Sequence, residues 1–167
     1  MLDPVQGPEH IPHPLAIVTA GDPSKPGERG GMAAAWLSRV SWKPPMVAVS
    51  IHPSRHTLEL VRRFGAFAVN LVSRRLEEAT MRVFGELSGR EADKFSVAGI
   101  TPRPARRIVA PVISEAPVVL ECNLVKTVEV GDHVLVIGEV VEAYKNSDEE
   151  PMVWLRGETR RLLEERR

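Results

Sequence analysis

The feature that most constrains the fold is a pair of long strand-like runs, PVVLECNLVKTVEV and HVLVIGEVVEAYK, separated only by Gly131 and Asp132. In the first run Leu120, Cys122 and Leu124 alternate with polar residues, which is the period of a strand with one buried face. A Gly-Asp pair between two such runs is a hairpin signal. The sequence therefore predicts a long antiparallel β-hairpin over residues 117–145.

Four shorter segments upstream of the hairpin are also expected to be strands. They cover residues 15–20, 33–40, 46–52 and 66–72. The third has the clearest signal, because Val47, Val49 and Ile51 alternate with Met46, Ala48 and Ser50. Strands thus predominate and come in hairpin-linked groups. This order favours a mainly β fold, an antiparallel barrel that is closed or nearly closed, rather than a βαβ array.

A few short helices are expected outside the barrel. One begins near Ser54 or Thr57, both N-cap residue types, and ends at Gly65, which supplies a left-handed stop. A second covers residues 74–87 with Ser73 as its cap, because apolar residues recur on one of its helical faces. The charged tail over 156–167 is also helix-prone. The helices are therefore expected to be peripheral.

Length and charge exclude several classes of protein. A chain of 167 residues buries enough surface for one domain without a disulfide or metal staple, so we expect a single domain over 1–167 with peripheral extensions at 1–13 and 157–167. Its 22 basic and 22 acidic residues balance, which gives no sign of a nucleic-acid or membrane partner. The first residues lack the pattern of a signal peptide, and no apolar run is long enough to span a bilayer, so a cytoplasmic location is expected. The sole glutamine and 14 prolines favour a heat-adapted source.

Cysteine and histidine spacing argue against a metal enzyme. Cys122 is the only cysteine, so neither an intrachain disulfide nor a cysteine-based zinc site can form. It lies in an apolar run, where a buried thiol acts as a small hydrophobe. His52, His56 and His133 lack the spacing of a metal motif such as H-E-x-x-H. No metal site is expected.

The stretch GGMAAAW combines very small side chains with a large aromatic one. Ala33, Ala34 and Ala35 would let a flat ligand lie against the backbone, whose polar groups could contact the edges of that ligand. Trp36 would then form one wall. The alternative is that alanines on a barrel strand face a tightly packed interior or a second subunit. Spacing alone does not separate these interpretations.

The next stretch, SIHPSRHT, has the composition of a phosphate site. Ser50 ends a strand, and Ser54 and Thr57 stand where a helix is expected to begin, so free backbone N–H groups there would favour an anion. Arg55 supplies a fork of donors suited to phosphate. The alternative is an ordinary capping segment with a solvated arginine.

In these segments the chain resembles the flavin reductase-like family, of the flavoredoxin and ferric reductase type. The similar segments cover residues 14–144: PLAIVTA, GGMAAAWLSRVSWKPPMVAVSI, PSRHT, GAFAVNLV, SGREADKF, VAGIT, APVISEAPVVLEC and VGDHVLVIGEVV. No single segment is diagnostic, but six or more in the right order are fairly specific. The resemblance implies an FMN-binding split barrel, which is an antiparallel Greek-key β-barrel with a few short peripheral helices.

The resemblance also assigns roles to particular residues. Backbone groups of Ala33 to Trp36 would contact the polar edge of the isoalloxazine ring, and Ser50 and Ile51 would approach the ring or the ribityl chain. Arg55 and Thr57 would hold the phosphate, and Lys94 would lie near the flavin. His133 would lie near the nicotinamide or the flavin face, as the candidate catalytic residue. For Lys94 the alternative is an exposed lysine on a short helix, and for His133 a histidine that flanks a hairpin.

Three functions remain open on these residues. The first is an FMN-dependent NAD(P)H oxidoreductase, with FMN or FAD as the flavin, passing electrons to free flavin, ferric iron or a partner oxygenase. The second is a non-catalytic FMN protein that carries electrons, and the third is a barrel that has lost its cofactor. The resemblance implies a homodimer in each flavin-binding case, because split barrels of this family close the flavin site across two chains.

Overall fold

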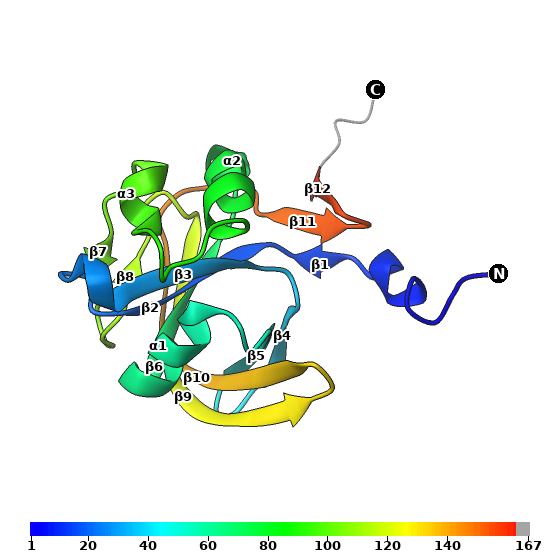
Figure 1. The fold of residues 1–167 in the computed structure, drawn as a ribbon, viewed down its shortest axis with the longest axis horizontal. Helices are drawn as coiled ribbons and strands as arrows, with labels where there is room; N and C mark the ends of the chain where they lie inside the picture. The colour runs from blue at the N-terminus through cyan, green and yellow to red at the C-terminus, as the bar shows by residue number, and fades with distance from the viewer. Residues whose placement is uncertain (163–167) are drawn as a thin grey trace.

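The computed structural model describes residues 1–162 of the chain, and its centre is one seven-stranded antiparallel sheet (Figure 1). The order of strands in that sheet is β3-β2-β6-β9-β10-β5-β4. The strands are β2 (Ala16–Gly21), β3 (Arg29–Ala34), β4 (Leu37–Ser41), β5 (Met46–Ile51), β6 (Ala66–Leu71), β9 (Val118–Val130) and β10 (His133–Lys145). The prediction of mainly antiparallel β structure with a few short helices is confirmed.

The long hairpin of β9 and β10 joins the two halves of the sheet. The first half of β9 pairs with β6, whereas the first half of β10 pairs with β5. The β9–β10 pairing has register shifts between Ile137 and Gly138 and between Val140 and Glu142, in the middle of the hairpin. Because such bulges bend a strand and increase its twist, the hairpin curves around the barrel. Its turn is at Gly131, with φ of 56°, as the sequence predicts.

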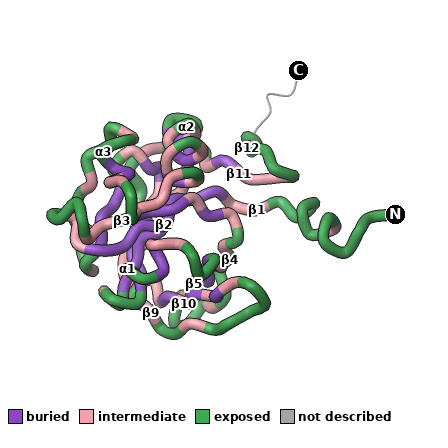
Figure 2. Tube along the Cα trace, viewed as in Figure 1, coloured by how far each residue is buried: buried purple, intermediate pink, exposed green. Residues whose placement is uncertain are grey.

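Two hydrophobic clusters lie on opposite faces of β2 and β6, and β2 is buried along its length (Figure 2). Along β2, Ala16 and Val18 face the barrel interior, where Phe67 and Val49 are also fully buried. Ile17 faces the other way, into the second cluster. The alternation follows from the period of a strand, and it lets one sheet support both clusters. Cys122 is buried in the interior cluster, where burial raises the pKa of its thiol to about 12, so it packs as the neutral hydrophobe that the sequence predicts.

The remaining elements of the described residues are short helices and small strands. They are η1 (Gly7–His10), η2 (Pro26–Glu28), α1 (His56–Phe64), η3 (Arg74–Leu76), α2 (Glu77–Ala79), η4 (Thr80–Phe84), α3 (Lys94–Ala98), β1 (His13–Pro14), β7 (Arg103–Pro104), β8 (Pro111–Val112), β11 (Met152–Leu155) and β12 (Glu158–Arg161). The sheet β1-β11-β12 lies beside the barrel, and the exposed N-terminal segment extends away from it (Figures 1 and 2).

Three sequence-based expectations of secondary structure are wrong. The strand expected over 33–40 is two strands, because the chain leaves β3 at Ala34 and begins β4 at Leu37. The helix expected over 74–87 is a 3-10 turn, a short α turn and a π turn, and the Ser73 hydroxyl donates to Glu149 instead of capping it. The tail forms strand β12 rather than a helix, while residues 163–167 lie outside the described part.

Candidate functional site

Strand β3 leaves one of its edges open to a cavity. It is the end strand of the seven-stranded order, and within residues 1–162 β2 is its one paired neighbour. The N–H and C=O groups on its other edge are therefore available to other partners. One of them is already used, because Lys94 Nζ donates to the carbonyl oxygen of Gly31 at 2.8 Å. The alanines that follow along this strand leave the edge accessible.

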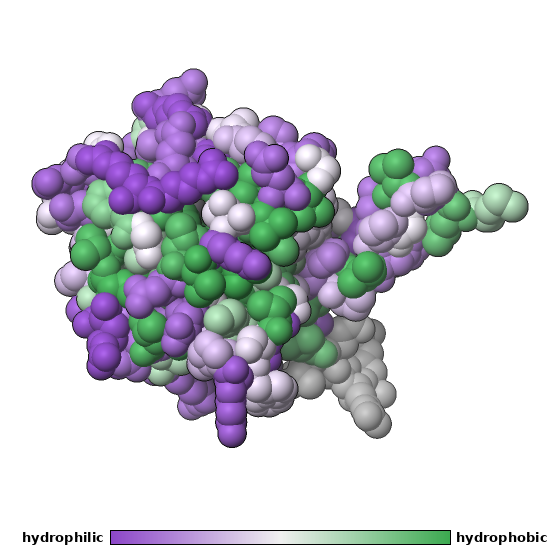
Figure 3. Space-filling view, turned by 90° about the horizontal axis from the view of Figure 1, so that it is seen from below, coloured by the Kyte–Doolittle hydropathy of each residue, from purple (hydrophilic) through white to green (hydrophobic). Residues whose placement is uncertain are grey.

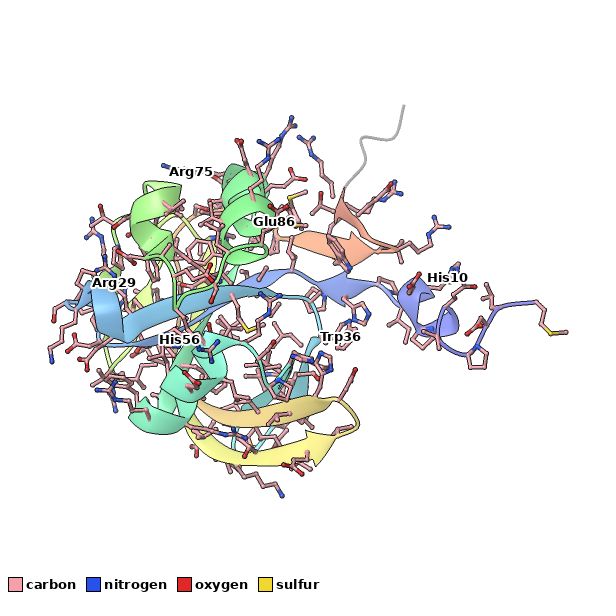
Figure 4. The ribbon with its side chains drawn as sticks, viewed as in Figure 1. His10, Arg29, Trp36, His56, Arg75 and Glu86 are labelled. Carbon is pink, nitrogen blue, oxygen red and sulfur yellow. The ribbon has the colours of Figure 1, made fainter. Side chains whose placement is uncertain are left out.

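A first cavity of about 260 Å³ lies at the ends of β3 and β5 and the start of β10. Its lining residues come from six segments of the chain: Leu15, Met32, Ala33, Ala34, Ala35, Trp36, Ser50, His52, Arg55, Met81, His133 and Trp154. In Figure 4 Trp36 lies at the end of β3, where the chain passes into β4. Seven residues that the sequence analysis singled out thus border one space. We call it the ring cavity.

A second cavity of about 170 Å³ adjoins the first at Met32 and Arg55, which line both. It lies between the start of α1 and the connection that follows η4, and we call it the anion cavity. Its other lining residues are Ser54, His56, Thr57, Glu86, Leu87, Ser88, Gly89 and Lys94. Four residues predicted from the sequence to lie near the phosphate or the flavin, namely Ser54, Arg55, Thr57 and Lys94, therefore meet here. The alanine stretch and Arg55 line one continuous cleft.

The local structure of α1 concentrates positive potential in the anion cavity. Arg55 is the N-cap residue and makes no side-chain cap, so neither Ser54 nor Thr57 caps this helix as the sequence predicted. Leu58 N donates to the Arg55 carbonyl at 3.1 Å, but the amides of His56 and Thr57 have no carbonyl partner within the helix, and the helix dipole adds to their attraction for anions. Arg55 donates weakly to the carbonyl oxygen of Gly85 at 3.3 Å, and this leaves most of its guanidinium donors for a ligand.

Lys94 is a buried cation at the base of the anion cavity. Its side chain is not exposed on a short helix: the residue is 4% exposed, and its Nζ donates to Gly31 O at 2.8 Å and to Phe84 O at 3.1 Å. Burial, and secondarily the nearby charge of Arg55, lowers the pKa of Lys94 to about 8. The only acidic residue on the cavity wall is the exposed Glu86. A phosphate would supply the missing negative charge beside Lys94.

A cluster of three aromatic side chains, Trp36, His52 and His133, also borders the ring cavity. The rings of Trp36 and His133 have centroids 4.8 Å apart, and His52 meets His133 edge-on at 5.3 Å. His133 Nδ1 lies 2.7 Å from the Asp132 carboxylate. This hydrogen bond orients the imidazole, and it lowers the pKa of Asp132 from its usual value. His133 thus flanks the hairpin turn and also lines the cavity, so the two sequence interpretations of this residue are compatible.

The cavity lining differs from the sequence prediction in two ways. Ile51 is fully buried in the barrel core and lines neither cavity, so its side chain is not positioned to touch a ligand there. Trp154 and Met81 line the ring cavity but were not singled out. They come from β11 and from the π turn, and no local motif distinguishes them from ordinary packing residues.

These surroundings fit a planar heterocycle that carries a phosphate on a chain. Small side chains and open backbone groups suit the ring, and Arg55, Lys94 and the helix start suit the phosphate. The donor set does not suit a metal ion, because residues 1–162 contain no group of three or more His, Cys, Asp or Glu side chains that could hold one. In the same part of the chain no helix has the length and apolar character to cross a membrane.

Comparison with known proteins defines the class. The family model for the flavin reductase like domain matches residues 9–163 of the chain. The chain therefore belongs to the flavin reductase-like domain family. A flavin reductase of Pseudomonas putida is 32% identical over 146 residues, covering 87% of this chain and 81% of the relative. An uncharacterized protein of Aeropyrum pernix is 36% identical over 87% of this chain, and the chain spans only 55% of its length.

Solved structures confirm the split-barrel fold. The NADH:FAD oxidoreductase of Streptomyces globisporus superposes with a TM-score of 0.85 at 26% identity, covering 98% of each chain. The flavoredoxin of Desulfovibrio vulgaris (Miyazaki F) superposes with a TM-score of 0.82 at 27% identity, covering 93% of this chain and 90% of that one. The family thus includes proteins named as reductases and proteins named as flavoredoxins.

Proposed function

We propose that this protein is an FMN-dependent NAD(P)H oxidoreductase. The isoalloxazine ring would occupy the ring cavity and the phosphate the anion cavity. One observation carries the proposal: Arg55 lines both cavities, so the space for a ring directly adjoins the space for an anion. The relatives named as a flavin reductase and as an NADH:FAD oxidoreductase support this activity.

The residues of the chain would bind, orient and exclude water, while the chemistry belongs to the cofactor. A bound flavin accepts hydride from a nicotinamide at N5 and passes electrons onward. The open edge of β3 at Ala33 to Ala35 would hydrogen-bond the polar edge of the ring, and Ser50 would contact its ribityl side. Arg55, Thr57, Ser54 and Lys94 would hold the phosphate. Trp36 and His133 would border the face that receives the nicotinamide.

A second function is favoured by the likeness to a flavoredoxin. In that case the protein would bind FMN as an electron carrier and would be reduced by another enzyme rather than by NAD(P)H. Both functions use the same cleft, so its geometry does not separate them. Their difference is whether a reduced nicotinamide can deliver hydride to the bound flavin.

The test is to load the purified protein with FMN and add NADH or NADPH without oxygen. Rapid loss of the visible flavin absorbance would support the reductase. Colour that is retained with both nicotinamides but lost with dithionite would support the carrier. A protein that takes up no FMN would contradict both and leave a barrel without cofactor. Free flavin, ferric complexes and a partner oxygenase are then compared as acceptors.

His133→Ala is expected to slow flavin reduction about threefold to tenfold while changing FMN affinity much less. The physical reason is that His133 packs on Trp36 at 4.8 Å, and an aromatic contact of this kind is worth about 0.5–1.5 kcal/mol in positioning. Stopped-flow reduction by NAD(P)H measures the rate, and a fluorescence titration measures binding. An unchanged reduction rate would remove His133 from the site.

We also propose a homodimer that closes the cleft. On the side of the molecule seen in Figure 3, apolar residues are exposed between charged ones. A groove of about 670 Å³ lies among β4, β5, β9 and β10, and its lining includes Leu37, Met46, Val47, Leu120 and Val140. Burying these side chains against a second copy would remove apolar surface from water. Sedimentation equilibrium at micromolar concentration should give twice the chain mass, and a monomer would contradict the proposal.

A further inference from the structure

The connection between η4 and α3, residues 85–93, forms a strap over the anion cavity (Figure 1). Both of its ends are held by arginine side chains, one from the start of α1 and one from β3. At Gly85 the carbonyl oxygen accepts from Arg55 Nη1 at 3.3 Å. At Asp93 the carboxylate pairs with Arg29, with N–O distances of 3.2 and 2.6 Å, and both side chains are less than 15% exposed. In Figure 4 Arg29 lies on β3, close to the start of α3.

Arg90 fastens the middle of the strap to the start of α1. Its Nη1 donates to the carbonyl oxygen of Ser54 at 2.7 Å, and its Nη2 donates to Glu59 Oε1 at 2.7 Å. The other oxygen of Glu59 lies 3.1 Å from His56 Nδ1. Arg90 and Glu59 are each more than 40% exposed, so this contact can open without disturbing the core. We call the set formed by Arg90, Glu59 and the Ser54 carbonyl the latch.

Close packing supports the closed position of the strap. The hydrogen of Gly89 faces the His56 ring: a Cβ placed at Gly89 would lie 3.1 Å from His56 Cδ2. In Figure 4 His56 lies at the first turn of α1. The strap and the helix start are thus in direct contact at Gly89 and again at Arg90. Between them remains the anion cavity of about 170 Å³.

The closed strap limits the length of the ligand that fits the anion cavity. A terminal phosphate ends inside the cavity, where Arg55, Lys94 and the first amides of α1 surround it. A dinucleotide flavin continues from that phosphate to a second phosphate and an adenosine. Apart from Met32 and Lys94, the lining residues belong to the strap and to the start of α1. On the side away from the ring cavity we therefore expect that continuation to pass between Gly89 and His56 or through the latch. It would also pass Glu86, whose carboxylate repels a second phosphate.

We propose that the latched strap makes the anion cavity a monophosphate site, so that the protein binds FMN in preference to FAD, and that Arg90 is the residue that sets this preference. The inference rests on the proposed function, because it assumes that a flavin occupies the cleft. It assigns Arg90 a role in selection by closing the strap rather than by touching the phosphate. Arg55 and Lys94 serve binding of both flavins.

The test compares the dissociation constants of FMN, FAD and riboflavin by fluorescence titration. The wild-type protein is expected to bind FMN at least about tenfold more tightly than FAD, since opening the latch costs charge-assisted hydrogen bonds. Arg90→Ala and Glu59→Ala should each shrink the FAD-to-FMN ratio of dissociation constants several-fold. The double variant should shrink it no further, because both substitutions open the same latch. Riboflavin, which has no phosphate, should bind all four proteins equally.

Arg82→Ala is the matched control, because Arg82 is an exposed arginine whose partner is Glu78 within the preceding helical turns. It should leave the ratio unchanged, and circular dichroism checks that every variant is folded. Equal FMN and FAD affinity in the wild-type protein, or an unchanged ratio in both Arg90→Ala and Glu59→Ala, would overturn the inference while leaving the proposed function intact. Failure of the wild-type protein to bind any flavin would instead refute the proposed function, and this inference with it.

Discussion

Replacing Arg55 with alanine is expected to weaken FMN binding by about 10- to 150-fold. The guanidinium lines both cavities, so it is the side chain placed between the ring and the phosphate of a bound flavin. A charge-assisted hydrogen bond to phosphate is worth about 1.5–3 kcal/mol, and each 1.4 kcal/mol is about tenfold in affinity. Isothermal titration calorimetry at constant salt measures the change.

The control for this substitution is Arg62→Ala. Arg62 is an exposed arginine in the last turn of the same helix, at the end away from the anion cavity. It removes an equal charge but should change FMN affinity less than about twofold, because exposed charges are screened by salt. Riboflavin has no phosphate, so Arg55→Ala should weaken riboflavin binding much less than it weakens FMN binding. Wild-type FMN affinity in Arg55→Ala would show that the phosphate lies elsewhere.

Lys94→Met is expected to weaken FMN binding about tenfold or more at pH 7. The substitution should also remove the decrease of FMN affinity that the wild-type protein is expected to show above pH 8. In the free protein the pKa of Lys94 is lowered to about 8 by burial, whereas a phosphate beside it favours the charged form. Below pH 8 the lysine is already protonated, so binding needs no proton. Above pH 8 binding must take up a proton, and FMN affinity should fall by up to about tenfold per pH unit.

The measurement is the FMN dissociation constant at several values between pH 7 and 9.5, where the phosphate itself does not change charge. The same pKa has a second consequence without ligand. Between pH 8 and the unperturbed value of 10.5, Lys94 binds more protons in the unfolded chain than in the folded chain, so this residue makes the free energy of unfolding rise with pH. The raised pKa of Cys122 acts in the opposite direction above pH 9, so the contribution of Lys94 is measured as the difference between the wild-type protein and Lys94→Met. If the FMN affinity of the wild-type protein does not change between pH 7 and 9.5, Lys94 does not contact the phosphate.

Much of the barrel could be predicted because its strands carry local signals. The β9–β10 hairpin matches the expected segment to within a residue at each end, and β2, β5 and β6 lie where alternation or β-branched composition placed them. Gly65 ends α1 in the left-handed conformation at φ of 66°, as its position indicated. In each case the information is contained in a few neighbouring residues, so the environment did not override it.

The errors occur where tertiary contacts override local preference. Residues 158–161 have helix-forming composition, but they pair with β11 through a two-residue turn at Arg156 and Gly157, both with positive φ. Residues 80–84 form a π turn rather than a regular helix, and this turn presents the Phe84 carbonyl to Lys94. Lys94 and Phe84 are close in sequence but the third member of that contact, Gly31, lies 63 residues away.

Residue type and short-range spacing were enough to predict strands β2, β5, β6, β9 and β10, the small-residue stretch at Ala33 to Ala35 and the basic segment at Arg55. The tertiary structure alone decided that these two stretches share one cleft, that Lys94 is buried beside them and that Arg90 fastens a strap over them. These relations depend on which strand edge stays open and which segments the barrel brings together. Such contacts form between residues far apart in the chain, and no local pattern records them.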